Sequence, residues 1–363
     1  MSIINELLVK AVEEGASDIH MKEDAPPYFR LRGALVSSGF EDLDGDAMNA
    51  VIHDIMPEHA VKQYEETHEA DFSLMEEGAG RFRVNIFDCS GIPAIVMRHI
   101  NDVIPTCEEL GLPPQIKELA HVHRGIILVC GTTGSGKSST LASMINEMNT
   151  NMNRRIITIE DPIEYMFQDG NSIISQREVG LDTFNFSKAL RAFMRQDPDV
   201  IMVGEMRDTV SFMAALQASE TGHLVISTLH SATAAQSIHR ILDMFPAEEQ
   251  DSIRMSMASN MHAIVAQRLV PSIQGGREPA VEIMVNNGTV RKLLQKNNLE
   301  VLNAAIETGS DDGMQTFNQS VYNLIKSGLI TESEGMKAAT NPEALKMNLQ
   351  GIFLDEGKRI LAT

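Results

Sequence analysis

The sequence contains no tryptophan, few other aromatic residues and few cysteines. Aromatic side chains make up 5% of its 363 residues, and the three cysteines are Cys89, Cys107 and Cys130. They lie far apart and form no C-x-x-C pair, which argues against a structural zinc site and agrees with a reduced, cytosolic setting. No apolar run approaches the roughly 18 residues that a membrane-spanning helix needs. We therefore expect no transmembrane segment.

Basic residues are also in deficit. The chain has 30 lysines and arginines against 50 acidic residues, a formal net charge of -20. Nucleic-acid motors usually carry a basic track, because neutralising phosphates supplies most of their non-specific affinity. The acidity argues against such a motor and against direct adsorption to anionic lipid, although a local basic channel stays compatible with it. The first 15 residues lack the basic start of a signal peptide, so we expect a cytoplasmic protein.

The chain length and its patterns predict two domains. Residues 1–100 are typical of a small α+β domain, with an amphipathic helix first and a hairpin near the end. Residues 101–123, rich in proline, are the predicted linker. In residues 124–288 short apolar strands alternate with helical stretches, which predicts an α/β core with a mainly parallel sheet. Residues 289–363 are predicted to be helical.

A glycine-rich loop follows the apolar stretch GIILVC. The loop GTTGSGKSST fits the phosphate-binding pattern G-x-x-x-x-G-K-[ST], and an amphipathic helix follows it. Backbone N–H groups in such a loop face phosphate oxygens at the positive end of the helix. Lys137 is expected to reach the β- and γ-phosphates and Ser138 to hold Mg²⁺. The predicted nucleotide-binding residues are Gly131, Thr132, Thr133, Gly134, Ser135, Gly136, Lys137, Ser138 and Ser139.

Carboxylates follow two further predicted strands. The stretch RIITIEDPIEY supplies Glu160, Asp161 and Glu164, and the stretch DVIMVGE ends in Glu205. In open α/β sheets, ligands bind beyond the carboxyl ends of the strands. Carboxylates at these ends could hold Mg²⁺ or orient the attacking water. We expect Asp161 and Glu205 to join Ser138 in a magnesium site.

Histidines and arginines complete the set of candidates. His223 and His230 lie on either side of the apolar stretch LVISTL, where a histidine at the end of a central strand could sense the γ-phosphate by a hydrogen bond. Arginines supplied by a neighbouring subunit could stabilise charge on the transferring phosphoryl group. The arginine candidates are Arg81, Arg83, Arg98, Arg195 and Arg207.

The order of these motifs resembles a known family. GTTGSGKSST, TIEDPIEY, SQREVGLDT, RQDPDVIMVGEMRD, ETGHLVISTLH and AQRLVP follow one another as in the secretion-type ATPases that power type IV pili and type II secretion. The resemblance extends from SDIH at residue 17 to GMQTFNQS at residue 313. It implies a hexamer whose subunits have an N-terminal PAS-like domain and a C-terminal RecA-like ATPase domain. Nucleotide is then expected between the two domains.

The resemblance also implies roles for single residues. Glu164 matches the family's catalytic glutamate, and Glu205 matches its atypical Walker B position. The stretch ETGHLVISTLH, with His223 and His230, matches its His box. Arg83 and Arg98 match arginines that reach the nucleotide from the N-terminal domain. Both glutamates stay open as the general base, and we favour Glu164.

Within the family, the retraction motors of the PilT/PilU type are most similar. Assembly and secretion ATPases usually carry an extra N-terminal domain and a four-cysteine zinc motif, whereas this chain begins almost at the PAS-like domain and has no cysteine pair. The stretch GMQTFNQSVYNLIKSGLIT also resembles the retraction motors. Their motif AIRNLIRE is replaced by GTVRKLLQ at residues 288–295. A PilU-like or divergent retraction motor therefore fits as well as a PilT-like one.

The resemblance thus predicts a homohexameric, Mg²⁺-dependent ATPase that uses ATP to retract type IV pili and drive twitching motility. Its expected partner is an inner-membrane platform protein of the PilC type, with a paralogous retraction ATPase as a further candidate and no nucleic acid. The motor is expected to be cytoplasmic and peripheral at the inner membrane. The alternatives are an assembly or type II secretion ATPase, a nucleic-acid translocase, and a regulator that binds nucleotide without hydrolysing it.

Overall fold

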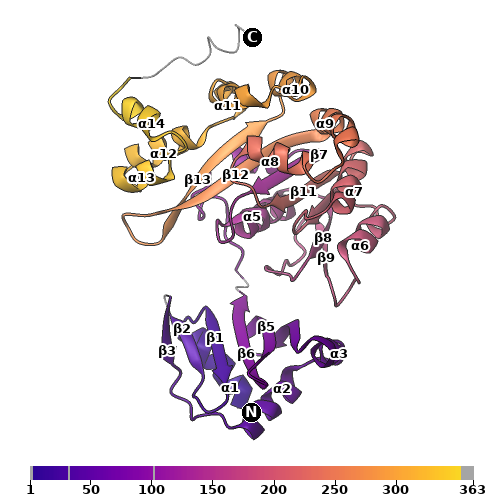
Figure 1. Cartoon of the computed structure of the whole chain (residues 1–363), viewed down its shortest axis with the longest axis vertical. Helices are drawn as coiled ribbons and strands as arrows, with labels where there is room; N and C mark the ends of the chain where they lie inside the picture. The colour runs from indigo at the N-terminus through magenta and orange to yellow at the C-terminus, as the bar shows by residue number, and fades with distance from the viewer. Residues whose placement is uncertain (1–2, 32, 101–102, 353–363) are drawn as a thin grey trace. The chain divides into compact units, whose positions relative to one another are not determined.

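The computed structural model describes residues 3–31, 33–100 and 103–352, which divide into two compact units (Figure 1). Unit 1 comprises Met1–Val103 with the short segments Asp161–Met166 and Gly180–Asp182, and the rest of the chain forms unit 2. The two short segments lie inside the predicted α/β core in sequence, so unit 1 is discontinuous along the chain. The predicted domain boundaries stay a prediction. Of the predicted linker and helical end, residues 101–102 and 353–363 lie outside the described residues.

Unit 1 is built on an antiparallel sheet with the strand order β3-β2-β1-β6-β5-β4. Its strands are β1 (Asp18–Lys22), β2 (Tyr28–Leu31), β3 (Ala34–Ser37), β4 (Glu69–Glu76), β5 (Gly80–Cys89) and β6 (Ile92–Ile100). Its helices are α1 (Ile3–Glu13), α2 (Gly45–Ile55) and α3 (Glu58–Thr67). The predicted amphipathic helix is α1, whose Leu7 and Leu8 are buried against the sheet core with Phe29 and Phe82.

The predicted hairpin is β5 and β6, which pair antiparallel along their whole length. Ser90 and Gly91 connect the strands, and both have positive φ, 57° and 79°. Two-residue turns with positive φ at both residues match the right-handed twist of the flanking strands. Cys89, the last residue of β5, is exposed beside this turn.

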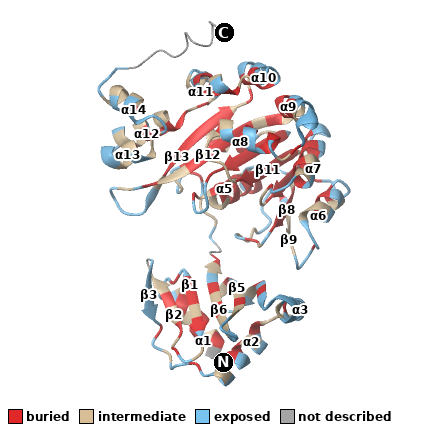
Figure 2. Cartoon of the chain, viewed as in Figure 1, coloured by how far each residue is buried: buried red, intermediate tan, exposed pale blue. Residues whose placement is uncertain are grey.

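Unit 2 is built on a seven-stranded sheet with the order β13-β12-β7-β11-β10-β8-β9. All neighbours are parallel except β12 and β13, so the sheet is mixed. The strands are β7 (Gly125–Cys130), β8 (Arg155–Glu160), β9 (Ile173–Glu178), β10 (Val200–Val203), β11 (Leu224–Leu229), β12 (Met261–Pro271) and β13 (Arg277–Val285). Every residue of β7, β10 and β11 is buried, as expected for parallel strands covered on both faces (Figure 2).

Helices pack on both faces of this sheet. Alternate residues of β7 belong to different cores: Ile127 and Val129 pack with α4 and α5, whereas Ile126 and Leu128 belong to the larger core of the opposite face. The helices are α4 (Gln115–Ala120), α5 (Lys137–Asn151), α6 (Phe186–Phe193), α7 (Thr209–Glu220), α8 (Ala234–Leu242) and α9 (Ala247–Asn260). The helix α4 lies within the segment that was predicted as linker, and its Ile116 is fully buried.

Beyond β13, the described residues of unit 2 form short helices that lie beside β13 and α9 (Figure 1). They are α10 (Gly288–Gln295), α11 (Leu302–Glu307), α12 (Phe317–Lys326), α13 (Glu332–Ala338) and α14 (Pro342–Leu349), with short 3-10 turns at Leu299–Val301 and Ser310–Asp312. None of the helices in the described part of the chain has the length and hydrophobicity needed to cross a bilayer. The α/β fold is confirmed, whereas β9, β12 and β13 were not predicted.

A substitution at Phe212 measures how much a single aromatic side chain contributes to the stability of the core of unit 2. It is fully buried on α7, with its ring centroid 6.0 Å from that of Phe245. Phe212→Ala is expected to lower the free energy of unfolding by about 3–5 kcal/mol, because it leaves a cavity. Urea denaturation measures the change. Phe184→Ala is the control, since Phe184 is 83% exposed; equal losses in the two variants would contradict the assigned core.

Candidate functional site

The candidate residues gather where four neighbouring parallel strands end. These strands are neighbours in the order β7, β11, β10, β8. Cys130 at the end of β7 is paired with Leu229 at the end of β11. Val203 at the end of β10 is paired with Ser227 of β11 and with Ile159 of β8. The strands therefore end together at one edge of the sheet. The phosphate loop leaves β7 there, and the segments that carry the predicted histidine and carboxylates leave the other three. This edge is where open α/β sheets bind ligands.

The phosphate loop passes close to β12 at two of its glycines, Gly131 and Gly136. A Cβ atom on Gly131 would lie 2.3 Å from Ser135 Oγ and 2.6 Å from the carbonyl oxygen of Gln267. One on Gly136, where φ is 86°, would lie 2.9 Å from Gln267 Nε2. The buried Gln267 side chain also accepts a hydrogen bond from Thr140 Oγ1 at 2.7 Å. Gln267 thus forms the floor beneath the loop and the first turn of α5.

Lys137 is the first residue of α5, and its side chain is buried. Its Nζ donates to the carbonyl oxygens of Gly131 and Thr132, each at 3.0 Å, so the ammonium group lies over the loop. Ser135 Oγ is buried in the same loop without a hydrogen-bond partner among the described residues. A buried lysine, a free hydroxyl and the start of a 15-residue helix fit a bound polyphosphate chain.

Glu205, just beyond β10, is held from two sides. His230, just beyond β11, lies with Nε2 3.2 Å from Glu205 Oε1, and Arg207 Nε lies 2.7 Å from Oε2. Thr228 Oγ1 donates to the carbonyl oxygen of Gly204 at 2.7 Å, which fixes the end of β10 against β11. The predicted residues Glu205 and His230 are therefore brought together. Arg207, one of the arginine candidates, pairs with this carboxylate of its own chain through a side chain that is 67% exposed.

The carboxylates after β8 differ in their surroundings. Glu160 is buried and accepts hydrogen bonds from Thr158 Oγ1 at 2.7 Å and from Gln176 Nε2 at 3.1 Å. These bonds give Glu160 a structural place in the sheet. Asp161 and Glu164 are exposed, in the segment that belongs to unit 1. Asp161 stays a candidate ligand of Mg²⁺, and Glu164 stays a candidate general base.

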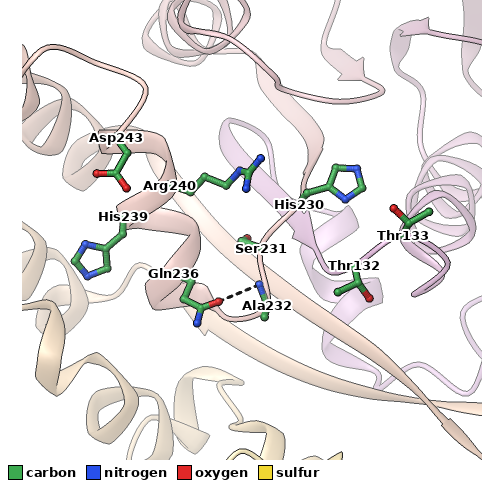
Figure 3. Close-up of a pocket in the computed structure, with 9 residues that line it drawn as sticks. All are labelled: Thr132, Thr133, His230, Ser231, Ala232, Gln236, His239, Arg240 and Asp243. Carbon is green, nitrogen blue, oxygen red and sulfur yellow. Dashed lines mark hydrogen bonds between the residues drawn. The ribbon is translucent and has the colours of Figure 1, made fainter.

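A pocket of about 650 Å³ lies between the phosphate loop and α8 (Figure 3). Thr132 and Thr133 come from the loop, His230 from the end of β11, and Arg240 from α8. In Figure 3 the Arg240 side chain extends toward His230, whereas Asp243 lies at the far end of the pocket. The full lining comprises Thr132, Thr133, His230, Ser231, Ala232, Gln236, His239, Arg240 and Asp243. Its α8 residues and Gln267 were not predicted, since they lack a motif.

Oxygen donors that suit Mg²⁺ are present at this edge. Ser138 offers a half-buried hydroxyl on the first turn of α5, and Glu205 offers a carboxylate. Mg²⁺ prefers such hard oxygen ligands and usually keeps several waters and substrate phosphates as well. No cluster of three or more His, Cys, Asp or Glu side chains in the described residues is arranged to hold a metal ion.

His223 lies at the other end of the sheet from the phosphate loop. It precedes β11, whereas His230 follows this strand. Its Nδ1 lies 2.9 Å from the carbonyl oxygen of Ala218 and 3.0 Å from Thr221 Oγ1, and it lines a separate pocket with His123. His223 therefore lies away from the phosphate loop of its own chain, and its predicted role stays a prediction.

Arg83 and Arg98 form an exposed pair on unit 1. They are directly opposite each other on β5 and β6, so their side chains emerge on the same face of the sheet. The Arg83 side chain is 43% exposed, with Nε 4.0 Å from Asp71 Oδ1. The Arg98 side chain is 65% exposed, with Nε 2.8 Å from Asp18 Oδ1. Each guanidinium group thus has an acidic partner within unit 1 while most of its neighbourhood stays open to solvent.

Comparisons with known proteins show which family the chain resembles. The family described as type II/IV secretion system protein matches residues 1–323. The chain is 41% identical over 340 residues to the type IV pilus retractation ATPase PilT of Pseudomonas aeruginosa, covering 94% of this chain and 99% of PilT. It is 38% identical over 345 residues to the type IV pilus ATPase PilU of the same species, covering 95% and 90%. A crystal structure of the pilus retraction motor PilT with bound ADP superposes with a TM-score of 0.89 at 44% identity, covering 94% and 98%.

Gly131→Ala tests the contact between the phosphate loop and β12. The new methyl group would collide with Ser135 and with the Gln267 backbone, so the loop would have to move away from its floor. We expect the affinity for a fluorescent ATP analogue to fall at least about tenfold, since backbone N–H groups would no longer face the phosphates. Gly288→Ala is the control, because its Cβ would meet no atom within 4 Å. Unchanged affinity in Gly131→Ala would contradict the described loop.

Proposed function

Because this chain belongs to the type II/IV secretion system protein family, we propose that it is a Mg²⁺-dependent ATPase motor that powers the retraction of type IV pili and so twitching motility. The family predicted from the motifs, the ATPase class and the retraction type are confirmed by its relatives. The observation that carries the proposal is the meeting of the Lys137 loop with Glu205 and His230 at one edge of the sheet.

The loop binds the triphosphate through backbone N–H groups and Lys137. The ammonium group now shared by two loop carbonyls would turn to the β- and γ-phosphates, which offer stronger, charged acceptors. Ser138 and Glu205 supply protein oxygens for Mg²⁺, with Asp161 as a further carboxylate. When bound, the cation neutralises charge that develops on the phosphates.

Water activation is assigned to a glutamate, and Glu164 stays our first choice as general base. Support comes from the contacts of the alternative: both carboxylate oxygens of Glu205 already face partners, His230 and Arg207, which leaves them less available to orient a water molecule. His230 then orients Glu205 and would contact the γ-phosphate from the end of β11. We include no direct role for His223 on the same chain.

The motor is proposed to work as a homohexamer in which one subunit completes the site of the next. Arg83 and Arg98 would reach the nucleotide of a neighbouring subunit and stabilise charge on the transferring phosphoryl group. Support comes from their pairing and exposure on unit 1. ATP would favour one arrangement of the units over another, and hydrolysis would reverse the preference. The ring would act in the cytoplasm on an inner-membrane platform protein of the PilC type.

An accessory retraction motor is the second candidate. The observation that favours it is α10, which carries GTVRKLLQ where the retraction motors carry AIRNLIRE. Val290, Leu293 and Leu294 are buried beneath this helix, while Arg291 and Lys292 are exposed. The buried side chains hold the helix against the core, whereas the exposed Arg291 and Lys292 make its outer face basic.

Lys137→Ala tests the proposed function in the test tube and in cells. We expect MgATP turnover to fall at least about 100-fold, because the variant loses a cation placed at the developing charge. The control is Lys62→Ala, an exposed lysine on α3 that is expected to keep wild-type turnover. Turnover that survives in Lys137→Ala would contradict the ATPase mechanism.

In cells that lack the protein we expect an excess of surface pili, counted by electron microscopy, which the wild type corrects and Lys137→Ala does not. Bald cells would show instead that the motor assembles pili. An unchanged count would favour the accessory role.

Arg83→Ala tests whether the site is shared between subunits. We expect turnover to fall by about 10³ while ATP binding persists, the loss typical of an arginine that acts on the transition state. Mixing Arg83→Ala with Lys137→Ala subunits is expected to restore turnover, because an intact arginine then faces an intact phosphate loop across some interfaces. A mixture as inactive as its components would contradict action in trans.

A further inference from the structure

A buried carboxylate behind the nucleotide pocket connects the first residues of two helices. Glu282 on β13 is only 2% exposed. Its Oε1 accepts a hydrogen bond from the N–H of Ala234 at 2.8 Å, and the N–H of Phe317 also faces the carboxylate. The preceding residue of β13, Val281, donates its N–H to Ser320 Oγ of α12 at 3.0 Å, so β13 is bonded to both helices at this point. Ala234 begins α8, which lines the pocket, and Phe317 begins α12 in the helical end of the chain. A carboxylate is favourable at both places, because each is the positive end of a helix.

The hydrogen bond between Glu282 and the N–H of Ala234 connects β13 to a wall of the pocket. Ser237 Oγ donates to the carbonyl oxygen of Thr233 at 2.8 Å and lies 2.6 Å from Ser231 Oγ. The first turn of α8 is therefore tied to the segment between His230 and Thr233, which forms this wall of the pocket. A displacement of Ala234 would move that wall with it.

The surroundings of the Glu282 carboxylate also include contacts with the C-terminal helices. Arg268 on β12 places its guanidinium carbon 3.9 Å from the centroid of the Phe317 ring. Its Nη1 donates to the carbonyl oxygen of Ala338, at the end of α13, at 2.7 Å. Burial raises the pKa of Glu282, while the Ala234 N–H and the charge of Arg268 lower it. The charge of Arg268 thus offsets part of the cost of burying the carboxylate.

We propose that Glu282 is a positioning residue that fixes the α8 wall of the nucleotide pocket and couples it to α12 and α13. The inference rests on the proposed nucleotide site. Separating α8 from α12 at this point would leave a buried carboxylate without one of its donors, which is far more costly than losing an exposed hydrogen bond. A shift of α8 on nucleotide binding is therefore passed to the C-terminal helices.

Hydrogen exchange of the full-length protein with and without a slowly hydrolysed MgATP analogue tests the coupling. We expect the nucleotide to slow exchange in residues 131–138, in residues 230–237 and also in residues 317–321. Slower exchange at 131–138 with no change at 317–321 would overturn the coupling while leaving the nucleotide site intact. No change at any of the three segments would overturn the proposed site and the coupling with it.

Glu282→Gln identifies the residue responsible. The amide can accept through its single oxygen, but its NH₂ group would face a second N–H, so one helix loses its bond. We expect 131–138 to stay protected by nucleotide while the protection at 317–321 is lost, and kcat/KM to fall about tenfold. Arg268→Lys keeps the charge but loses the planar contact with Phe317, and is expected to weaken protection at 317–321 alone. Wild-type protection at 317–321 in both variants would overturn the role of Glu282.

Asn286→Ala is the matched control for a loss of stability. Asn286 directly follows β13, is also buried, and donates from Nδ2 to the carbonyl oxygens of Ala258 and Met261. Removing its amide is expected to lower the melting temperature as Glu282→Gln does, but to keep turnover and protection at 317–321. Equal losses of kcat/KM in Asn286→Ala and Glu282→Gln would show that Glu282 acts only through stability and would overturn the proposal.

Discussion

The site depends on the parallel pairing of four buried strands. Because β7, β11, β10 and β8 are held in register by backbone hydrogen bonds, their carboxyl ends lie at one edge, and four segments distant in sequence meet there. A slip of one residue would turn every side chain of a strand to the opposite face, which both cores of unit 2 forbid. The chemistry of the edge is thus set by the packing of apolar side chains far from any phosphate.

Much of this edge could be predicted, because the relevant signals are local. The stretch GIILVC followed by GTTGSGKS specifies a strand, a loop and a helix within 14 residues (125–138), and Glu205 and His230 each follow an apolar strand directly. What escaped prediction depends on distant partners. Gln267 meets Thr140 across 127 positions, and Glu282 meets Ala234 across 48. His223 and His230 lie at opposite ends of the same strand, so the predicted role of His223 is not explained by contacts within its own chain.

Two of the unpredicted strands, β12 and β13, support the nucleotide pocket from different sides. Gln267 on β12 forms the floor of the phosphate loop, and Glu282 on β13 holds the opposite wall through α8. Both are buried polar residues in a sheet that is otherwise mainly apolar, and both accept a hydrogen bond from a helix: Gln267 from Thr140 of α5, and Glu282 from Ala234 of α8. Such residues restrict the ways in which a core can pack, because each must keep its partner. The pocket therefore owes its shape to strands that contain none of the nucleotide-binding motif.

The distribution of the three thiols has a practical consequence for spectroscopy. Cys107 and Cys130 are buried, and burial raises the pKa of the Cys130 thiol to about 11, so little reactive thiolate forms there at neutral pH. Cys89 is exposed beside the β5–β6 turn of unit 1. A maleimide dye would therefore attach mainly at one place in the natural sequence, away from the phosphate loop in the chain. The motor thus carries its own attachment point for fluorescence anisotropy or single-molecule recording of unit 1 during ATP turnover.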